Sequence, residues 1–217
     1  MATEKISEKR PAKLGTICKA LLISAGGFTA AYLGSSLLIG WLLVRPRRRS
    51  EYDCIPLFRF GQLEPITLTT SDDIRLHAWV LLSRRAQPED WVLVLHGYRS
   101  DRIVSQNRAR FFSRRGYNVL ILHFRGHGAS QRARISYGYH ERKDVKAAFE
   151  FIRSACPEAR IGIDGISMGA AAAAYAVGLE DLDPAWMILQ MFLDKISSLY
   201  QIVTKFKLQL LIVGPLK

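Results

Sequence analysis

Ser167 has the sequence setting of a reactive serine. It is the centre of the pentapeptide Gly165-Ile166-Ser167-Met168-Gly169, which follows a predicted buried strand at 160–164 and precedes an alanine-rich segment at 170–177. A strand, a tight turn and a helix in this order raise a serine hydroxyl above the end of a sheet, and the two glycines relieve crowding in the turn. The spacing therefore predicts a nucleophile for acyl transfer. The other interpretation is a strand-to-helix turn in which glycine and serine serve only as breaker and cap.

A second segment predicts part of the same site. The apolar run at 91–95 is typical of a central parallel strand, and it leads into the loop His96-Gly97-Tyr98. Acyl transfer develops a negative oxygen that needs two backbone N–H donors, one after the nucleophile and one from a loop that follows an earlier strand. The backbone amides of Met168 and Tyr98 are the candidates for these donors.

A third apolar run, at 118–123, leads into the glycine-rich loop 124–130, which reads Phe-Arg-Gly-His-Gly-Ala-Ser. With these three motifs in this order, the chain resembles the α/β-hydrolase superfamily, in the branch of serine aminopeptidases, monoacylglycerol lipases and small esterases. The resemblance covers about residues 65–189. It implies an α/β fold with a mainly parallel sheet, and hydrolysis of an ester, thioester or amide through an acyl intermediate on Ser167.

The chain departs from this family at the residues that activate the serine. The family's catalytic acid and histidine follow the serine in the sequence, whereas all five histidines of this chain precede Ser167. The family also often has an acidic residue where His123 stands. We therefore expect a fold that is incomplete at its C-terminus, by truncation or by a frameshift, and an incomplete triad that leaves an inactive protein as one outcome.

Other titratable residues stay open as substitutes. His96 and His127 follow strand ends, where a base would be needed, although the resemblance gives these positions loop-shaping roles. Candidates for the acid follow the serine, and further charged or titratable residues are expected at the surface, at caps or in structural roles. The acid candidates are Asp181, Asp183 and Asp194; the surface or capping residues are His77 and His140; the structural residues are Asp144 and Asp164.

The remaining periodicity fits the same architecture. A hairpin is expected at 66–69 and 75–82, a helix with one apolar face at 141–154, and a further strand at 186–189. Beyond them, a helical stripe at 196–206 and a strand-like run at 208–213 are expected. Strands separated by helices imply right-handed crossovers, a mainly parallel sheet and ligands at the carboxyl ends of its strands.

The N-terminal region predicts a membrane anchor. Residues 20–44 form a 25-residue stretch without a charge, which as a helix of about 37 Å can cross about 30 Å of hydrocarbon. Basic residues lie on both sides, so the orientation stays open. A cleaved signal peptide is the alternative. The expected organisation is a basic tail at 1–19, a transmembrane helix at 20–44, a linker at 45–63 and a partial α/β-hydrolase-like domain at 64–217.

The net charge of +12 is concentrated near this anchor, because residues 1–50 hold nine basic and two acidic residues. Anionic lipid headgroups therefore explain it better than nucleic acid, for which no interleaved aromatic and basic motif is present. A local run of nine arginines at 99–134 predicts either a solvated helix surface or attraction of an acidic substrate. The spacing of the three cysteines indicates neither a metal site nor a disulfide framework, and no cofactor motif is present.

These observations predict a single-pass membrane-anchored serine hydrolase with Ser167 as nucleophile and a small acyl compound as substrate. The alternatives are a non-catalytic binding protein at the membrane and a truncated gene product.

Overall fold

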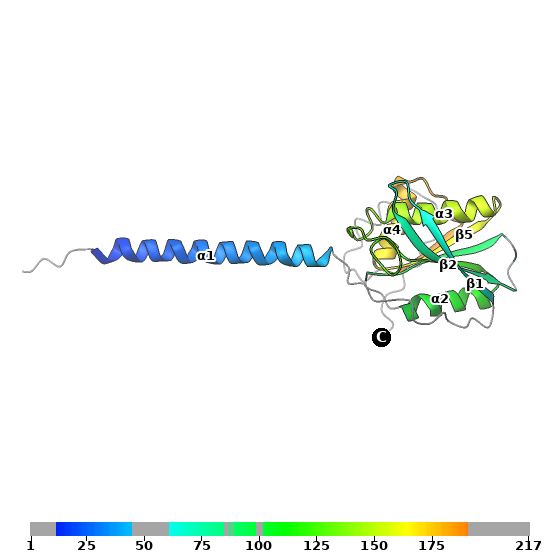
Figure 1. Ribbon diagram of the computed structural model, residues 1–217, viewed down its shortest axis with the longest axis horizontal. Coiled ribbons are helices and arrows are strands. Elements are labelled where there is room, and N and C mark those ends of the chain that lie inside the picture. Colours follow the sequence, from blue (N-terminus) through cyan, green and yellow to red (C-terminus); the bar gives the residue numbers. More distant parts are fainter. Residues whose placement is uncertain (1–11, 45–60, 85–86, 88, 99–101, 191–217) are drawn as a thin grey trace, which may run out of the picture. The chain divides into compact units, whose positions relative to one another are not determined.

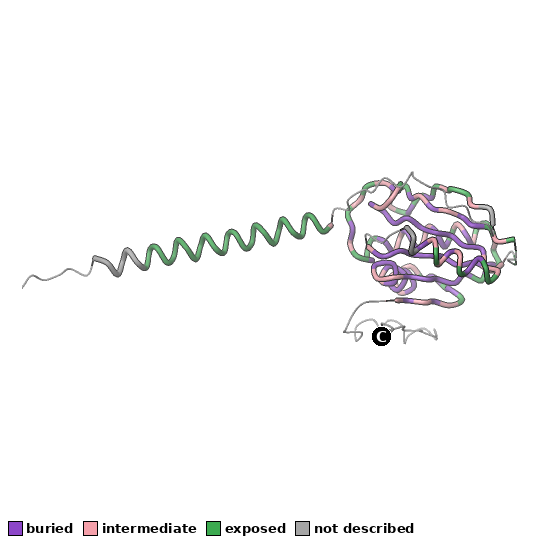
Figure 2. The backbone as a smooth tube through the Cα atoms, turned by 90° about the horizontal axis from the view of Figure 1, so that it is seen from below, coloured by how far each residue is buried: buried purple, intermediate pink, exposed green. Residues whose placement is uncertain are grey.

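The computed structural model describes residues 12–44, 61–84, 87, 89–98 and 102–190, and it divides into two compact units between Leu43 and Val44. The first unit holds one helix, α1 (Ala12–Leu43). The helix thus includes part of the segment expected as a basic tail. The side chains from Cys18 to Leu43, the part of α1 whose exposure is described, are exposed (Figure 2). By length and composition these 26 residues qualify as a candidate membrane span, although a signal sequence would meet the same criteria.

The second unit is built on a six-stranded mixed sheet (Figure 1). Its order is β1-β2-β4-β3-β5-β6. β2 pairs antiparallel with β1 and with β4, whereas the pairs β3–β4, β3–β5 and β5–β6 are parallel. The mainly parallel sheet expected from the sequence is therefore confirmed, with β2 as the reversed strand among those described. The strands are β1 (Gly61–Thr69), β2 (Arg75–Ser83), β3 (Asp90–Leu95), β4 (Asn118–Leu122), β5 (Arg160–Ile166) and β6 (Trp186–Gln190).

Helices cover both faces of the sheet. Figure 1 shows α2 (Arg102–Arg114) on one side, and α3 (Arg142–Ala155) and α4 (Met168–Leu179) on the other. In β3, Leu93 and Leu95 belong to the larger core beneath α3 and α4, whereas Val92 and Val94 belong to the smaller core beneath α2. A strand buried on both faces has no polar positions to alternate with, which explains the continuous apolar run at 91–95.

The described elements follow the sequence expectations closely. The hairpin forms as expected, but β1 begins at Gly61 and so extends into the range expected as a linker. The apolar face of α3 is buried through Val145, Ala148, Phe149 and Ile152. The helix and strand expected at 196–206 and 208–213 lie outside the described residues.

Candidate active site

Ser167 lies at a sharp turn between β5 and α4, with backbone angles φ 51° and ψ −113°. A residue with a side chain rarely adopts this conformation, and the cost is of order 1–3 kcal/mol, so the surrounding structure must hold it in place. The Ser167 amide donates a hydrogen bond to the Gln190 carbonyl at 2.7 Å, and its carbonyl accepts one from the Ala171 amide at 3.0 Å. The turn is thus fixed to β6 on one side and to α4 on the other.

The flanking glycines are required by contacts within the turn. A Cβ atom on Gly165 would lie 2.9 Å from the backbone of Ala170. A Cβ atom on Gly169 would lie 2.6 Å from the Leu95 carbonyl oxygen and 2.8 Å from that of His96. The absence of a side chain at Gly169 therefore lets the start of α4 pack directly on the end of β3. The structure brings the serine turn against the loop that holds His96, Gly97 and Tyr98.

Both ring nitrogens of His96 are engaged by the backbone. Nδ1 donates to the Gly97 carbonyl at 2.7 Å, and Nε2 accepts from the Phe124 amide at 3.2 Å. Burial, with a smaller effect from the neighbouring His127, lowers the pKa of His96 to about 4. A neutral imidazole with both nitrogens occupied has no lone pair left for a proton from serine. His96 is therefore a loop-positioning residue, and its use as a substitute base is excluded by this geometry.

His127 lies beside this loop. Its ring centroid is 4.9 Å from that of His96 and 6.0 Å from that of Tyr98. Nδ1 donates to the Arg125 carbonyl at 3.1 Å, and Nε2 is buried with no hydrogen-bond partner among the described residues. Burial lowers the pKa of His127, so the ring is neutral at pH 7.

The expectation that His77 is a surface or capping residue is wrong. His77 on β2 is half-buried, and its ring packs 5.3 Å from that of His123 at the end of β4. The two strands pair at this position, because the His123 amide donates to the His77 carbonyl at 3.0 Å. Burial also lowers the pKa of His77. His140, in contrast, is exposed, as expected.

The hydrogen bonds of Ser130 explain why the loop motif at 124–130 ends in a serine. Its hydroxyl donates to the His123 carbonyl at 2.6 Å and accepts from the His77 amide at 2.9 Å. The serine therefore closes the loop onto the β1–β2 hairpin.

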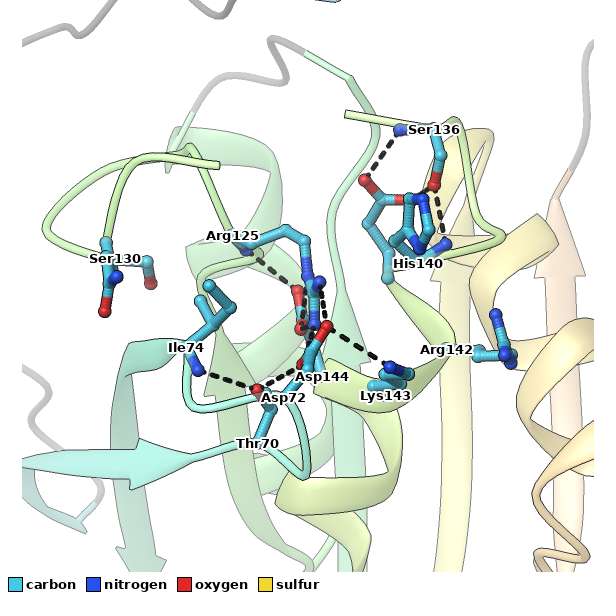
Figure 3. A network of polar contacts seen from close by, with 12 residues as sticks. Thr70, Asp72, Ile74, Arg125, Ser130, Ser136, His140, Arg142, Lys143 and Asp144 are labelled. Atoms are coloured by element: carbon cyan, nitrogen blue, oxygen red, sulfur yellow. Dashed lines mark hydrogen bonds and ion pairs between the residues drawn. The ribbon is translucent and has the colours of Figure 1, made fainter. Parts of the chain in front are cut away.

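Arg125, a residue of the same loop, anchors it to Asp72 and Asp144, as Figure 3 shows. Its side chain is 4% exposed. The guanidinium donates to both carboxylate oxygens of Asp72 at 2.8 and 2.9 Å, and to Asp144 Oδ1 at 2.8 Å. The Arg125 amide donates to Asp144 Oδ2 at 2.9 Å. Lys143 and Thr70 also contact Asp72.

This network joins the hairpin turn, the loop at 124–130 and the first turn of α3. The Arg125 guanidinium holds the pKa of Asp72 well below its usual range. Burial raises the pKa of Asp144, and its bonds to Arg125 oppose that shift. Asp144 is structural, as expected, but its partner is a buried arginine rather than the helix dipole alone. The roles of Arg125 and Asp72 were not predicted from the sequence, because the two residues lie 53 positions apart.

Arg108 differs from the expectation of a solvated or substrate-attracting arginine. It lies on α2 and forms a two-pronged ion pair, through Nε and Nη2, with the carboxylate of Asp164 on β5. The Asp164 side chain is 0% exposed. Asp164 is therefore structural, as expected, but its partner comes from the arginine run. An aspartate within the apolar strand 160–166 was the available signal that a buried cation faces it.

The described residues include no cluster of three or more histidine, cysteine or acidic side chains that could hold a metal ion. The acid candidates Asp181 and Asp183 are described at the end of α4 and in the following loop, whereas Asp194 lies outside the described residues. The Ser167 side chain makes no capping hydrogen bond to the start of α4.

Comparisons with known proteins agree with this geometry. Residues 86–201, more than half of the chain, match the sequence profile of the serine aminopeptidase S33 family. A Bacillus subtilis (strain 168) protein, the uncharacterized protein YqkD, is 23% identical over 177 residues, which are 77% of this chain and 58% of that protein. The chain therefore spans little more than half the length of this relative.

Solved structures show the same fold. One structure of the esterase Pf2001 from Pyrococcus furiosus aligns with a TM-score of 0.63 and 26% identity, over 78% of this chain and 76% of that chain. A second structure of the esterase aligns with a TM-score of 0.60 and 28% identity, over 71% and 62%. XC6422 from Xanthomonas campestris, a serine hydrolase without a lid, aligns with a TM-score of 0.54 and 21% identity, over 73% and 85%.

Proposed function

The chain belongs to the serine aminopeptidase S33 family of the α/β-hydrolase superfamily, and from this premise we propose that it is a serine hydrolase whose nucleophile is Ser167. The observation that carries the proposal is the backbone of Ser167, held at φ 51° by Gln190 and Ala171. A fold that only needed to turn from strand to helix would place glycine there, because glycine adopts this conformation without strain. A serine that is kept there despite this cost fits a catalytic role for its hydroxyl.

Two amides support an oxyanion site next to this hydroxyl. Met168 is the first residue of α4, so its N–H has no acceptor within the helix and lies at the positive end of the helix dipole. Tyr98 lies in the same loop as His96, whose carbonyl oxygen is so close to Gly169 that an added Cβ atom would lie 2.8 Å from it. In the proposed reaction the Ser167 oxygen attacks a carbonyl carbon, the two amides stabilise the negative oxygen, the leaving group departs and water releases the acyl group.

The proton of the Ser167 hydroxyl needs an acceptor. His96 is excluded, because the backbone engages both of its ring nitrogens. We propose that oxyanion stabilisation and substrate binding contribute to acylation, whichever group accepts this proton. In serine hydrolases that lack their triad, these alone leave a rate on the order of 10³ above that in water.

We propose an ester as the substrate. The support is the likeness to the Pyrococcus furiosus esterase at 26–28% identity. The serine aminopeptidase family name points to an amide bond as the second class to test. We also propose that Cys18–Leu43 anchors the protein in a membrane, because a helix that is apolar on all sides suits a lipid environment.

A fluorophosphonate probe tests the nucleophile. The full chain, purified in detergent, should be labelled at one site, and Ser167→Ala should abolish the labelling. The control is Ser136→Ala, because Ser136 is a loop serine bonded to buried Glu141. A folded chain that shows no labelling at Ser167 would contradict the hydrolase and favour a non-catalytic binding protein.

A further inference from the structure

We propose that Arg108 is a positioning residue for Ser167, because it joins the helix that follows the Tyr98 loop to the two strands that hold the serine turn. This inference deepens the proposed function and rests on it.

The first contact is with β5. Asp164 lies three residues before Ser167, and its fully buried carboxylate faces Arg108 through two parallel hydrogen bonds. An arginine fork fixes both the distance and the orientation of a carboxylate, which a single point charge does not do. The last residues of β5 are thereby fixed relative to α2.

The second contact is with β6. Arg108 Nη1 lies 3.4 Å from the side-chain oxygen of Gln190, and the Gln190 carbonyl accepts the Ser167 amide at 2.7 Å. Ile166 and Gln190 are also paired in the sheet register. One guanidinium therefore touches both strands that define the backbone of the nucleophile.

Arg108 lies on the helix that follows the Tyr98 loop in the sequence, so its two contacts connect this helix to the serine turn. α2 begins at Arg102, directly after the loop that carries the Tyr98 amide, and its residues Ala109 and Phe112 are buried against the sheet. The Met168 amide lies at the start of α4, after β5, the strand that carries Asp164. The ion pair links the helix that follows one oxyanion donor to the strand that precedes the other.

Packing alone does not account for a charged pair here. The same face of β5 carries Gly162, where an added Cβ would lie 2.1 Å from the ring of Trp186, so this face is otherwise apolar and tightly packed. Replacing a buried ion pair by apolar residues of similar volume is often neutral or stabilising. The pair therefore fits a role in geometry rather than in stability.

The test compares two double variants. Arg108→Met with Asp164→Leu removes the site pair and leaves no unpaired buried charge. Arg142→Met with Glu180→Leu removes a partly buried pair of 2.9 Å that lies between the start of α3 and the end of α4, away from the serine turn. Thermal unfolding confirms that each variant is folded. We expect the fluorophosphonate labelling rate of the first variant to be about 10- to 100-fold lower, because displacing a catalytic group by about 1 Å has an effect of this size in enzymes. The control variant should keep the parent rate.

A second readout does not depend on activity. Hydrogen exchange at the Ser167 amide reports its bond to Gln190, and we expect faster exchange at 164–170 in the first variant, with 145–152 in α3 unchanged. If that variant does not fold, Arg108→Lys keeps the charge without the fork and should show the same change in exchange. Parent-like exchange at 164–170 in a folded variant would overturn the positioning role. A parent chain that exchanges slowly there but is never labelled would contradict the proposed function instead.

Discussion

The imidazole of His96 accepts a hydrogen bond from the Phe124 amide at 3.2 Å, and this bond joins the ends of β3 and β4 beside the candidate active site. The bond requires a neutral ring, because a protonated Nε2 has no lone pair to accept with. The loop that carries the proposed oxyanion donor is thus sensitive to protonation of His96.

Acid should destabilise the globular unit through this ring. The folded-state pKa of His96 is lowered to about 4, below the unfolded value of about 6.5. The unfolded chain therefore binds more protons between these two values, and stability falls as the pH falls through that window. Between pH 7 and pH 5 we expect a loss on the order of 2 kcal/mol from His96, and further loss in the same direction from His77 and His127.

Urea unfolding at pH 7 and pH 5 measures this loss. His96→Gln keeps a donor and an acceptor but does not titrate, so its stability should depend less on pH than that of the parent. An unchanged pH dependence in this variant would show that His96 does not carry the effect.

A methyl group at Gly169 should disrupt the serine turn. In Gly169→Ala the Cβ would lie within 2.6–2.8 Å of two backbone carbonyl oxygens that cannot move independently of the sheet. We expect about 2–3 kcal/mol of destabilisation, as for other overpacked sites, and at least a tenfold slower labelling of Ser167. Gly27→Ala is the control, since nothing lies within 4 Å of its added Cβ. Denaturation midpoints and labelling rates measured on both variants check the prediction.

Removing the Tyr98 amide should affect labelling more than removing the Tyr98 hydroxyl. Tyr98→Phe keeps the N–H that we assign to the oxyanion site, and it should be labelled within about twofold of the parent. Tyr98→Pro has no N–H and should be labelled about 10²- to 10³-fold more slowly, the usual effect of losing one oxyanion donor. Equal rates in the two variants, with circular dichroism showing that both are folded, would exclude the Tyr98 amide as a donor.

Loss of Arg125 should destabilise the globular unit strongly. Arg125→Met leaves the carboxylate of Asp144 fully buried without its cation, and breaking a buried pair from one side typically costs about 3–5 kcal/mol. Asp72→Asn should cost less, because the Asp72 side chain is 30% exposed. Chemical denaturation of the two variants at pH 7 measures the difference, and the opposite order would contradict the network as described.

The stability that the ion pair between Arg125 and Asp72 contributes should depend on pH. Arg125 depresses the folded-state pKa of Asp72. The ion pair between them therefore contributes fully to the free energy of unfolding above the unfolded-state pKa of about 4, and this contribution is lost as the pH falls below that value. In Asp72→Asn the part of acid unfolding that occurs below about pH 4 should therefore be reduced. Stability measured at pH 5 and pH 3 for parent and variant checks this.

The sequence predicted the elements that have local signals. The apolar runs at 91–95 and 118–123 became β3 and β4, and the glycines around Ser167 predicted a turn that the backbone angles now describe. These predictions succeeded because a buried parallel strand and a tight turn restrict the residue types directly.

The sequence did not predict which charges meet. Arg108 and Asp164 are 56 residues apart, and Arg125 and Asp72 are 53 apart. A sequence does not distinguish a charged residue at the surface from one in a buried ion pair. Which charges pair depends on the order of the strands in the sheet. His77 was misplaced for the same reason, since its burial arises from pairing with β4 rather than from its own strand.

The bond between Ser167 and Gln190 has a consequence for biosynthesis. The amide belongs to residue 167 and its acceptor to residue 190, so a nascent polypeptide that has emerged only as far as α4 already contains the whole pentapeptide but lacks the partner that fixes its shape. The turn at Ser167 can therefore take its described shape only after the residues of β6 have been synthesised and have joined the sheet.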